Sequence, residues 1–198
     1  KAGLSGLSDA LYIMKIRDYL KEGGFRNFEG SCYYQKEQQN LLKEIIADKK
    51  RGLEIWFNAG DSADLFLSEG CELISFDIGR HTYVYDAKDY IDDKYPGKHT
   101  LVIGNSTETL PKHQGSYDFI YIDGNHRYEI ASQDIHNSRK LCHKDTIIII
   151  DDYVVQSKRK HNEGVIKAVN ELEDFIVVGQ RDFKGSGRGI IWGKFQHK

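Results

Sequence analysis

The stretch GLEIWFNAGDSADLFL, residues 52–67, decides the fold. It opens with a short apolar run, which is typical of a buried strand, and it ends with apolar residues at helical spacing. The turn between them contains Gly60, which lets backbone approach a ligand closely, and the helix that follows offers free N–H groups. We therefore expect this turn to cradle a nucleotide-type ligand, although the bulky Trp56 stands where a second glycine would be expected.

The same pattern of apolar runs and helical stretches continues toward the C-terminus. Near-continuous apolar runs are expected for parallel strands that are covered on both faces. Alternation of such strands with helices predicts a doubly wound, mostly parallel sheet of the Rossmann-like α/β class. The last two runs are too close together for a helix between them, so they predict an antiparallel hairpin at the sheet edge. The seven predicted strands are residues 53–57, 72–77, 100–104, 117–123, 146–152, 175–179 and 189–195.

The N-terminal quarter has a different character. Apolar residues at helical spacing predict helices over 8–22 and 35–50, separated by an irregular aromatic segment. We expect residues 1–50 to form helices and a lid, and residues 51–198 to form the core of a single domain. Four further helices are predicted near residues 61–69, 84–94, 127–141 and 161–173.

Composition narrows the functional classes. The net charge is −2, with 39% hydrophobic and 29% charged residues, as in an ordinary globular protein. This charge gives no field that would favour nucleic acid or an anionic membrane, and no apolar run is long enough to cross a bilayer. The three cysteines are scattered and form no CxxC pair, so we expect a reducing, cytoplasmic compartment rather than a disulfide framework or a zinc site.

Polar residues stand at the ends of the first three core strands. Ligands of open α/β sheets bind at the carboxyl ends of strands. Asp77 ends the second strand at the distance from the glycine turn that suits an acid on ribose hydroxyls, and Asn105 and Ser106 follow the third strand, where they could hydrogen-bond a base. Glu54 lies within the first strand, where a buried charge needs a partner such as a ligand amino group.

The fourth and fifth strands end in an acidic group. Asp123 and His126 follow one strand, and Asp151 and Asp152 end the next. Three carboxylates at one sheet edge repel one another unless some are protonated or a cation lies among them. Oxygen ligands suit Mg²⁺, Mn²⁺ or Ca²⁺ better than zinc. His126 is close enough to act as a general base near neutral pH.

In this order, the motifs resemble those of the class I S-adenosylmethionine (SAM)-dependent methyltransferases, over about residues 30–198. The resemblance is strongest to the small metal-dependent O-methyltransferases, both the catechol and caffeoyl-CoA types and the macrolide-sugar types. The family's E-x-G-x-x-x-G motif stands here as Glu54 to Gly60, with Trp56 in place of its first glycine. Asp123 and Asp151 lie 28 residues apart, a spacing typical of the metal-dependent members.

The resemblance implies a role for each of these residues. The methionine part of SAM would lie against Glu54, Asn58 and Gly60. Asp123 would serve the cofactor, the metal and catalysis, and His126 would be the base, as the D-x-x-H pattern of the sugar-modifying members suggests. The implied cofactor-binding residues are Glu54, Asn58, Gly60, Asp77, Asn105, Ser106 and Asp123, and the implied ligands of Mg²⁺ (or Mn²⁺) are Asp123, Asp151 and Asp152.

The resulting expectation is methyl transfer from SAM to a hydroxyl of a small-molecule or glycan acceptor, most simply a sugar diol. A catechol acceptor is one alternative, and a methyltransferase-like scaffold that has lost its cofactor because of Trp56 is another. Nucleic-acid methylation is disfavoured by the near-neutral charge. A homodimer and a domain of a larger glycan-modifying protein are both compatible with the sequence. We expect Tyr33, Tyr34 and Gln35 in the lid, and Arg127, Tyr128 and Tyr153 in the acceptor pocket.

Overall fold

The structure is a computed structural model, and it describes residues 14–29, 32, 35–154 and 162–196. Its centre is a seven-stranded sheet of order β3-β2-β1-β4-β5-β7-β6. Neighbouring strands are parallel from β3 through β5, and β7 runs antiparallel to both β5 and β6. The predicted doubly wound sheet with an antiparallel last strand is therefore confirmed. The strands are β1 (Arg51–Ile55), β2 (Glu72–Asp77), β3 (His99–Ile103), β4 (Tyr117–Ile122), β5 (Cys142–Asp151), β6 (Phe175–Phe183) and β7 (Arg188–Phe195).

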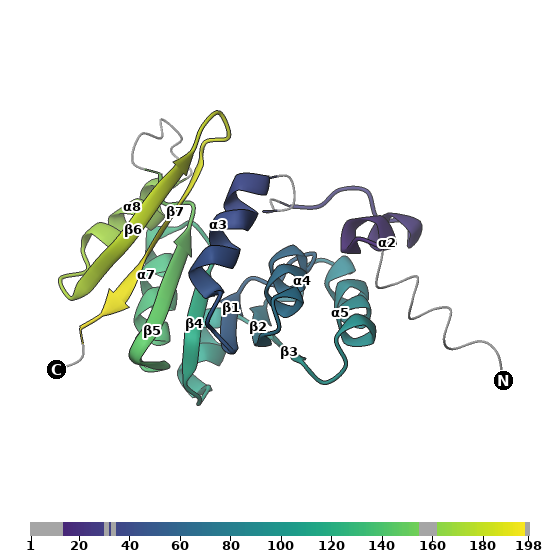
Figure 1. The fold of residues 1–198 in the computed structure, drawn as a ribbon, viewed down its shortest axis with the longest axis horizontal. Coiled ribbons are helices and arrows are strands. Elements are labelled where there is room, and N and C mark those ends of the chain that lie inside the picture. Colours follow the sequence, from purple (N-terminus) through teal and green to yellow (C-terminus); the bar gives the residue numbers. More distant parts are fainter. Residues whose placement is uncertain (1–13, 30–31, 33–34, 155–161, 197–198) are drawn as a thin grey trace.

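Helices cover both faces of this sheet (Figure 1). One core cluster joins α2 (Ile16–Glu22), α3 (Lys36–Ile46), α4 (Asp61–Ser68) and α5 (Tyr83–Lys94) to one face, including Phe119 and Tyr121 of β4. The second cluster joins α7 (Tyr128–Arg139) and α8 (Glu163–Asn170) to the other face, including Ile120 and Ile122. Short helical turns, α6 (Ser106–Thr109) and η2 (Leu110–Lys112), follow β3. The alternation of inward positions along β4 explains why its apolar run is continuous.

The N-terminal helix is attached to the start of α4. Arg17 of α2 donates to both carboxylate oxygens of Asp61, at 2.5–3.1 Å, and both side chains are almost completely buried. Its guanidinium also lies over the ring of Phe28, 4.6 Å from the centroid. This pair fixes the N-terminal segment above the turn that follows β1.

Several predicted boundaries are wrong. The first strand ends at Ile55 rather than at residue 57, because Trp56 adopts a φ of 84° and leaves the strand. The second predicted helix ends at Ile46 rather than at residue 50. The strand predicted over 175–179 continues to Phe183, so the turn of the last hairpin is only residues 184–187. Residues 8–13 of the first predicted helix, together with Tyr33 and Tyr34 of the predicted lid, lie outside the described residues.

Within the described ranges, no helix has the length and apolar character that a membrane span requires.

Candidate active site

The turn after β1 is bonded to the end of β2. The backbone N–H groups of Trp56 and Phe57 both donate to the carbonyl of Phe76, at 2.7 and 3.2 Å, and the N–H of Asn58 donates to Asp77 at 2.8 Å. Three successive N–H groups are thus fixed by two residues of the neighbouring strand. The chain meets this constraint by adopting positive φ at Trp56 (84°), Asn58 (53°) and Gly60 (76°).

The left-handed backbone at Trp56 is energetically unfavourable for a residue with a Cβ atom. A φ near +84° is favourable for glycine, whereas a residue with a Cβ loses roughly 1–2 kcal/mol in the left-handed region. Trp56 therefore has the backbone conformation that a glycine would adopt, although it carries an indole side chain. Backbone strain of this kind is found preferentially at functional sites.

A cavity of about 330 Å³ lies beside this turn, at the carboxyl ends of β1, β2 and β3. Three predicted cofactor-binding residues, Asp77, Asn105 and Ser106, line it together. The carboxylate of Asp77 accepts one backbone N–H on each oxygen, from Asn58 and from Gly79, both at 2.8 Å. The lining residues that the sequence analysis did not identify include Glu29, Ile78, Arg80 and Asn125.

Glu29 could not be found from the sequence, whereas Ile78 could have been. Glu29 reaches the cavity from the N-terminal segment and lies 3.2 Å from His81, a contact that depends on the packing of α2. Ile78 is 64% exposed and directly follows Asp77, so an apolar residue after the strand-end acid was an available signal.

Glu54, Asn58 and Gly60 do not line this cavity. Glu54 is fully buried, and its carboxylate accepts hydrogen bonds from Ser75 at 2.6 Å and Ser62 at 2.8 Å. The strand-buried charge therefore has protein partners in β2 and α4. The side chain of Asn58 accepts a hydrogen bond from Tyr83, and Gly60 precedes α4.

Burial also shifts the protonation of this inner group. Burial raises the pKa of Glu54 from 4.5 to about 8, although the two serine hydroxyls oppose the shift. The hydroxyl of Ser75 is also 2.7 Å from Nε2 of His99, whose pKa burial lowers to about 4. The first-strand glutamate is thus the centre of a buried polar group that joins β1, β2, β3 and α4.

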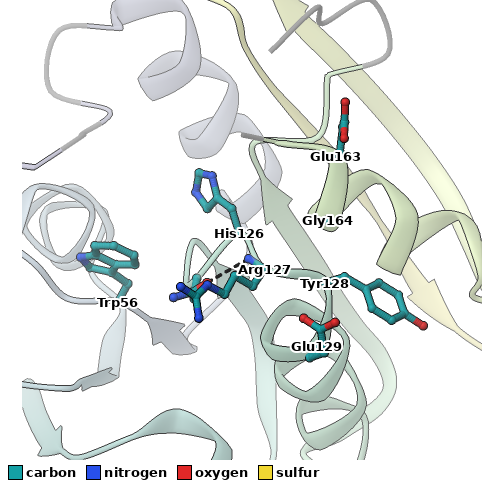
Figure 2. Close-up of a pocket in the computed structure, with 8 residues that line it drawn as sticks. Trp56, His126, Arg127, Tyr128, Glu129, Glu163 and Gly164 are labelled. Carbon is teal, nitrogen blue, oxygen red and sulfur yellow. Dashed lines mark hydrogen bonds between the residues drawn. The ribbon is translucent and has the colours of Figure 1, made fainter. Parts of the chain in front are cut away.

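A second cavity, of about 570 Å³, adjoins the first and contains the predicted base (Figure 2). His126, Arg127 and Tyr128 all line it, and Figure 2 shows the Arg127 side chain extending toward Trp56. Trp56, Asn125 and Arg127 line both cavities. These three residues therefore form the boundary between the two.

Both predicted pocket tyrosines have hydrogen-bond partners at the C-terminal end of α8. Tyr128 points away from Trp56 in Figure 2, and its hydroxyl donates to Glu171 at 2.5 Å. Tyr153 does not line the cavity, because it is buried and its hydroxyl donates to Asn170 at 3.0 Å. Of the two predicted pocket tyrosines, Tyr128 is the one that lines this cavity.

The acidic group assembles beside His126 as predicted, but its members have different surroundings. Asp123, His126 and Asp152 each offer one ligand atom, and these atoms lie within 4.8 Å of one another. Nε2 of His126 is 2.9 Å from Oδ2 of Asp152. Burial and the neighbouring carboxylates of Asp151 and Asp152 raise the pKa of Asp123 well above its ordinary value.

Asp151 is held by protein groups instead. Its Oδ2 accepts hydrogen bonds from Gln38 at 2.8 Å, Tyr121 at 2.5 Å and Arg188 at 2.9 Å. Sequence reasoning could not find Arg188, because its position beside Asp151 depends on the pairing of β7 with β5.

Substitutions at Trp56 should separate backbone strain from the role of the indole. Trp56→Gly and Trp56→Ala both remove the ring, but only alanine keeps a Cβ at positive φ. We expect the glycine variant to be more stable than the alanine variant by about 1 kcal/mol in urea unfolding. At the exposed Glu44 of α3 the same pair should show the opposite order by about 1 kcal/mol. Equal stability of the two variants at residue 56 would contradict the strain.

The buried Glu54 should make stability depend on pH. Because its pKa is raised to about 8, the unfolded chain releases this proton at lower pH than the folded chain. Between about pH 4.5 and pH 8 the unfolded state binds fewer protons, so the free energy of unfolding falls as pH rises, by at most about 1.4 kcal/mol per unit. Glu54→Gln should remove this contribution, and Glu44→Gln should keep it. Parallel pH profiles of the wild type and Glu54→Gln would argue against a buried, protonated Glu54.

The comparisons with known proteins agree with this geometry. No curated protein matches the chain. The solved structures that share its fold include an O-methyltransferase from Bacillus cereus in complex with S-adenosylhomocysteine (SAH), the O-methyltransferase TomG from Streptomyces achromogenes in complex with SAM, and an SAH-bound methyltransferase from Podospora anserina.

The likeness is one of fold, because the sequences are 15%, 15% and 17% identical to this chain. The TM-scores are 0.68, 0.65 and 0.64, in the same order. The matches cover 96%, 100% and 81% of this chain and 97%, 91% and 78% of the others. The methyltransferase domain family matches residues 54–153, half of the chain, from the buried glutamate of β1 to the residue after the Asp151–Asp152 pair. The chain belongs to the methyltransferase domain family, with the class I fold of the small O-methyltransferases.

Proposed function

We propose that this chain transfers the methyl group of SAM to a hydroxyl oxygen of a small acceptor. The observation that carries the proposal is the contact between two cavities across Trp56, Asn125 and Arg127. One cavity holds the residues suited to a nucleoside, and the other holds a histidine paired with a carboxylate. Methyl transfer needs this arrangement, because the sulfonium methyl must lie in line with an oxygen that is losing its proton.

In this proposal the cofactor lies in the cavity of about 330 Å³. The Asp77 carboxylate would accept hydrogen bonds from the ribose hydroxyls. Each of its two oxygens already accepts one backbone hydrogen bond, and a carboxylate offers about four acceptor positions, so about two remain. Asn105 and Ser106 would bond the adenine edge, with the exposed face of Ile78 against the ring. The SAM and SAH complexes of the structural neighbours support this choice of cofactor.

The methionine part would then lie at the turn after β1. We propose that the backbone of Asn58 and Gly60 faces it, and that Glu54 acts indirectly by holding Ser62 at the start of α4. Trp56 would lie at the point where the methyl group passes from the cofactor cavity to the acceptor cavity. The presence of a cavity beside the indole favours an enzyme over a scaffold that has lost its cofactor.

His126 is the proposed general base. Its Nδ1 is buried, so Nε2 would take the acceptor proton. The Asp152 carboxylate, 2.9 Å from Nε2, would then accept a hydrogen bond from the new N–H and stabilise the imidazolium. Asp123 lies beside this pair and completes the group. No covalent intermediate between enzyme and acceptor is needed.

The donor set also fits a divalent cation. Mg²⁺ is commonly bound by one or two carboxylates together with water and substrate oxygens, and Asp123 and Asp152 provide two carboxylates within reach of each other. We propose these two residues as the ligands of Mg²⁺ or Mn²⁺. When bound, the cation would lower the pKa of an acceptor hydroxyl.

A sugar diol is the proposed acceptor class. The second cavity is lined by the polar or charged side chains of Asn125, Arg127, Glu129 and Glu163, which offer hydrogen-bonding partners to a hydroxyl-rich molecule, and also by Trp56 and Tyr128. A catechol would also present two neighbouring oxygens, and it is the second candidate. The acceptor would be a free small molecule or a glycan, and a homodimeric or multidomain setting remains a prediction.

Transfer of labelled methyl groups to a panel of sugar diols and catechols tests the proposal. SAH at about 100 times its Kd should stabilise the fold by about 2.7 kcal/mol. His126→Gln should lower the rate of transfer by about 10²–10⁴-fold and leave SAH affinity unchanged, since the histidine lines the other cavity. The exposed His136 of α7 provides the matched control, His136→Gln, which should keep full activity.

The opposite results would separate the alternatives. Transfer to catechols but not to sugars would favour the second acceptor class. Absence of SAH binding, with the protein folded and Mg²⁺ present, would contradict the enzyme and support the scaffold.

A further inference from the structure

Both oxygens of the Asp151 carboxylate accept hydrogen bonds from protein groups. Its Oδ2 accepts from Gln38 of α3, Tyr121 of β4 and Arg188 of β7, and its Oδ1 accepts from the backbone N–H of Asp152 at 2.8 Å. An ionised carboxylate has about four acceptor positions. Three of the four donors are on Oδ2, one is on Oδ1, and only 2% of the residue is exposed, so protein groups already bond both oxygens of this carboxylate.

Arg188 supplies a positive charge inside the acidic group. Its side chain is 16% exposed, and it is paired with the completely buried side chain of Asp151. A buried carboxylate needs a charged or hydrogen-bonding partner, and an arginine remains protonated at every accessible pH. The guanidinium therefore balances one of the three carboxylates permanently, before any ion binds.

We propose that Arg188 takes the place of a metal ion at Asp151, so that a divalent cation is left with Asp123 and Asp152 as its carboxylate ligands. The inference rests on the metal site of the proposed function, and it changes the assignment of Asp151. This residue becomes a positioning residue rather than a ligand, and Arg188 becomes the fixed cation of the site.

The same contacts explain how the pair positions the base. The N–H of Asp152 is bonded to Asp151, and Asp152 has a left-handed backbone with a φ of 58°. The side chain of Asp152 then meets His126. A continuous chain of polar contacts runs from Arg188 on the last strand through Asp151 and Asp152 to His126.

Titration of Mn²⁺ alone into the full chain tests this assignment, with free Mn²⁺ followed by electron paramagnetic resonance. The decisive variant is the double substitution Asp151→Asn with Arg188→Met. It removes one negative and one positive charge, so the net charge around the cation is unchanged. If Asp151 is not a ligand, the double variant should bind Mn²⁺ within about threefold of the wild type, whereas Asp123→Asn should lose at least about tenfold.

The single variant Arg188→Met gives the complementary result. It frees a buried carboxylate beside the site, so Mn²⁺ affinity should rise at least about tenfold, an increase that general structural damage would not produce. Arg181→Met is the matched control, because Arg181 lies on the adjacent strand β6 and pairs with Glu37 of α3 on the surface. It should leave Mn²⁺ affinity unchanged.

Three outcomes decide the matter. Loss of Mn²⁺ binding in the double variant, to the extent seen in Asp123→Asn, would overturn the proposal, because Asp151 would then be a ligand. A wild type that binds no Mn²⁺ beside an Arg188→Met variant that does would support Arg188 as the built-in cation and contradict the metal site of the proposed function. Absence of binding in both would overturn the inference. If Arg188→Met fails to fold, the charge-balanced double variant still decides.

Discussion

The backbone turn after β1 is the constraint on which both cavities depend. Its three successive N–H groups are bonded to Phe76 and Asp77 at the end of β2, and this requires left-handed backbone at Trp56. The indole is thereby directed to the boundary between the two cavities. Trp56 replaces a glycine of the family's motif, but its backbone keeps the left-handed conformation that a glycine would adopt. Its indole adds an aromatic surface at the position where the cofactor and the acceptor would meet.

Buried polar groups hold this edge of the sheet rigid. Glu54 joins β1 to β2 and α4 through two serine hydroxyls, and Asp151 joins β5 to α3, β4 and β7 through four donors. Both are strand-end or strand-interior acids that the sequence alone would assign to a ligand. Both acids accept their hydrogen bonds from protein groups instead. Asp77 and His126 line the cavities, and Asp152 lies behind His126, where it is bonded to Asp151.

The core strands were predictable because burial on both faces produces apolar runs, and the strand-end positions of Asp77 and Asp123 follow from the parallel order. Local pattern could not show that β6 continues to Phe183, since residues 180–182 are polar and carry no apolar signal. It could not show that Trp56 leaves the strand, because positive φ there is imposed by bonds to another strand. Nor could it place Arg188 beside Asp151, a contact made across 37 residues of chain.

Fluorescence of Trp56 during titration with SAH tests the central claim most directly. The chain has two tryptophans, and Trp192→Phe leaves Trp56 as the sole reporter at the boundary of the two cavities. A saturable change with one-to-one stoichiometry is the predicted result, because the cofactor would lie against the indole. An unchanged spectrum up to millimolar SAH, with the variant folded and Mg²⁺ present, would contradict a cofactor site at this turn.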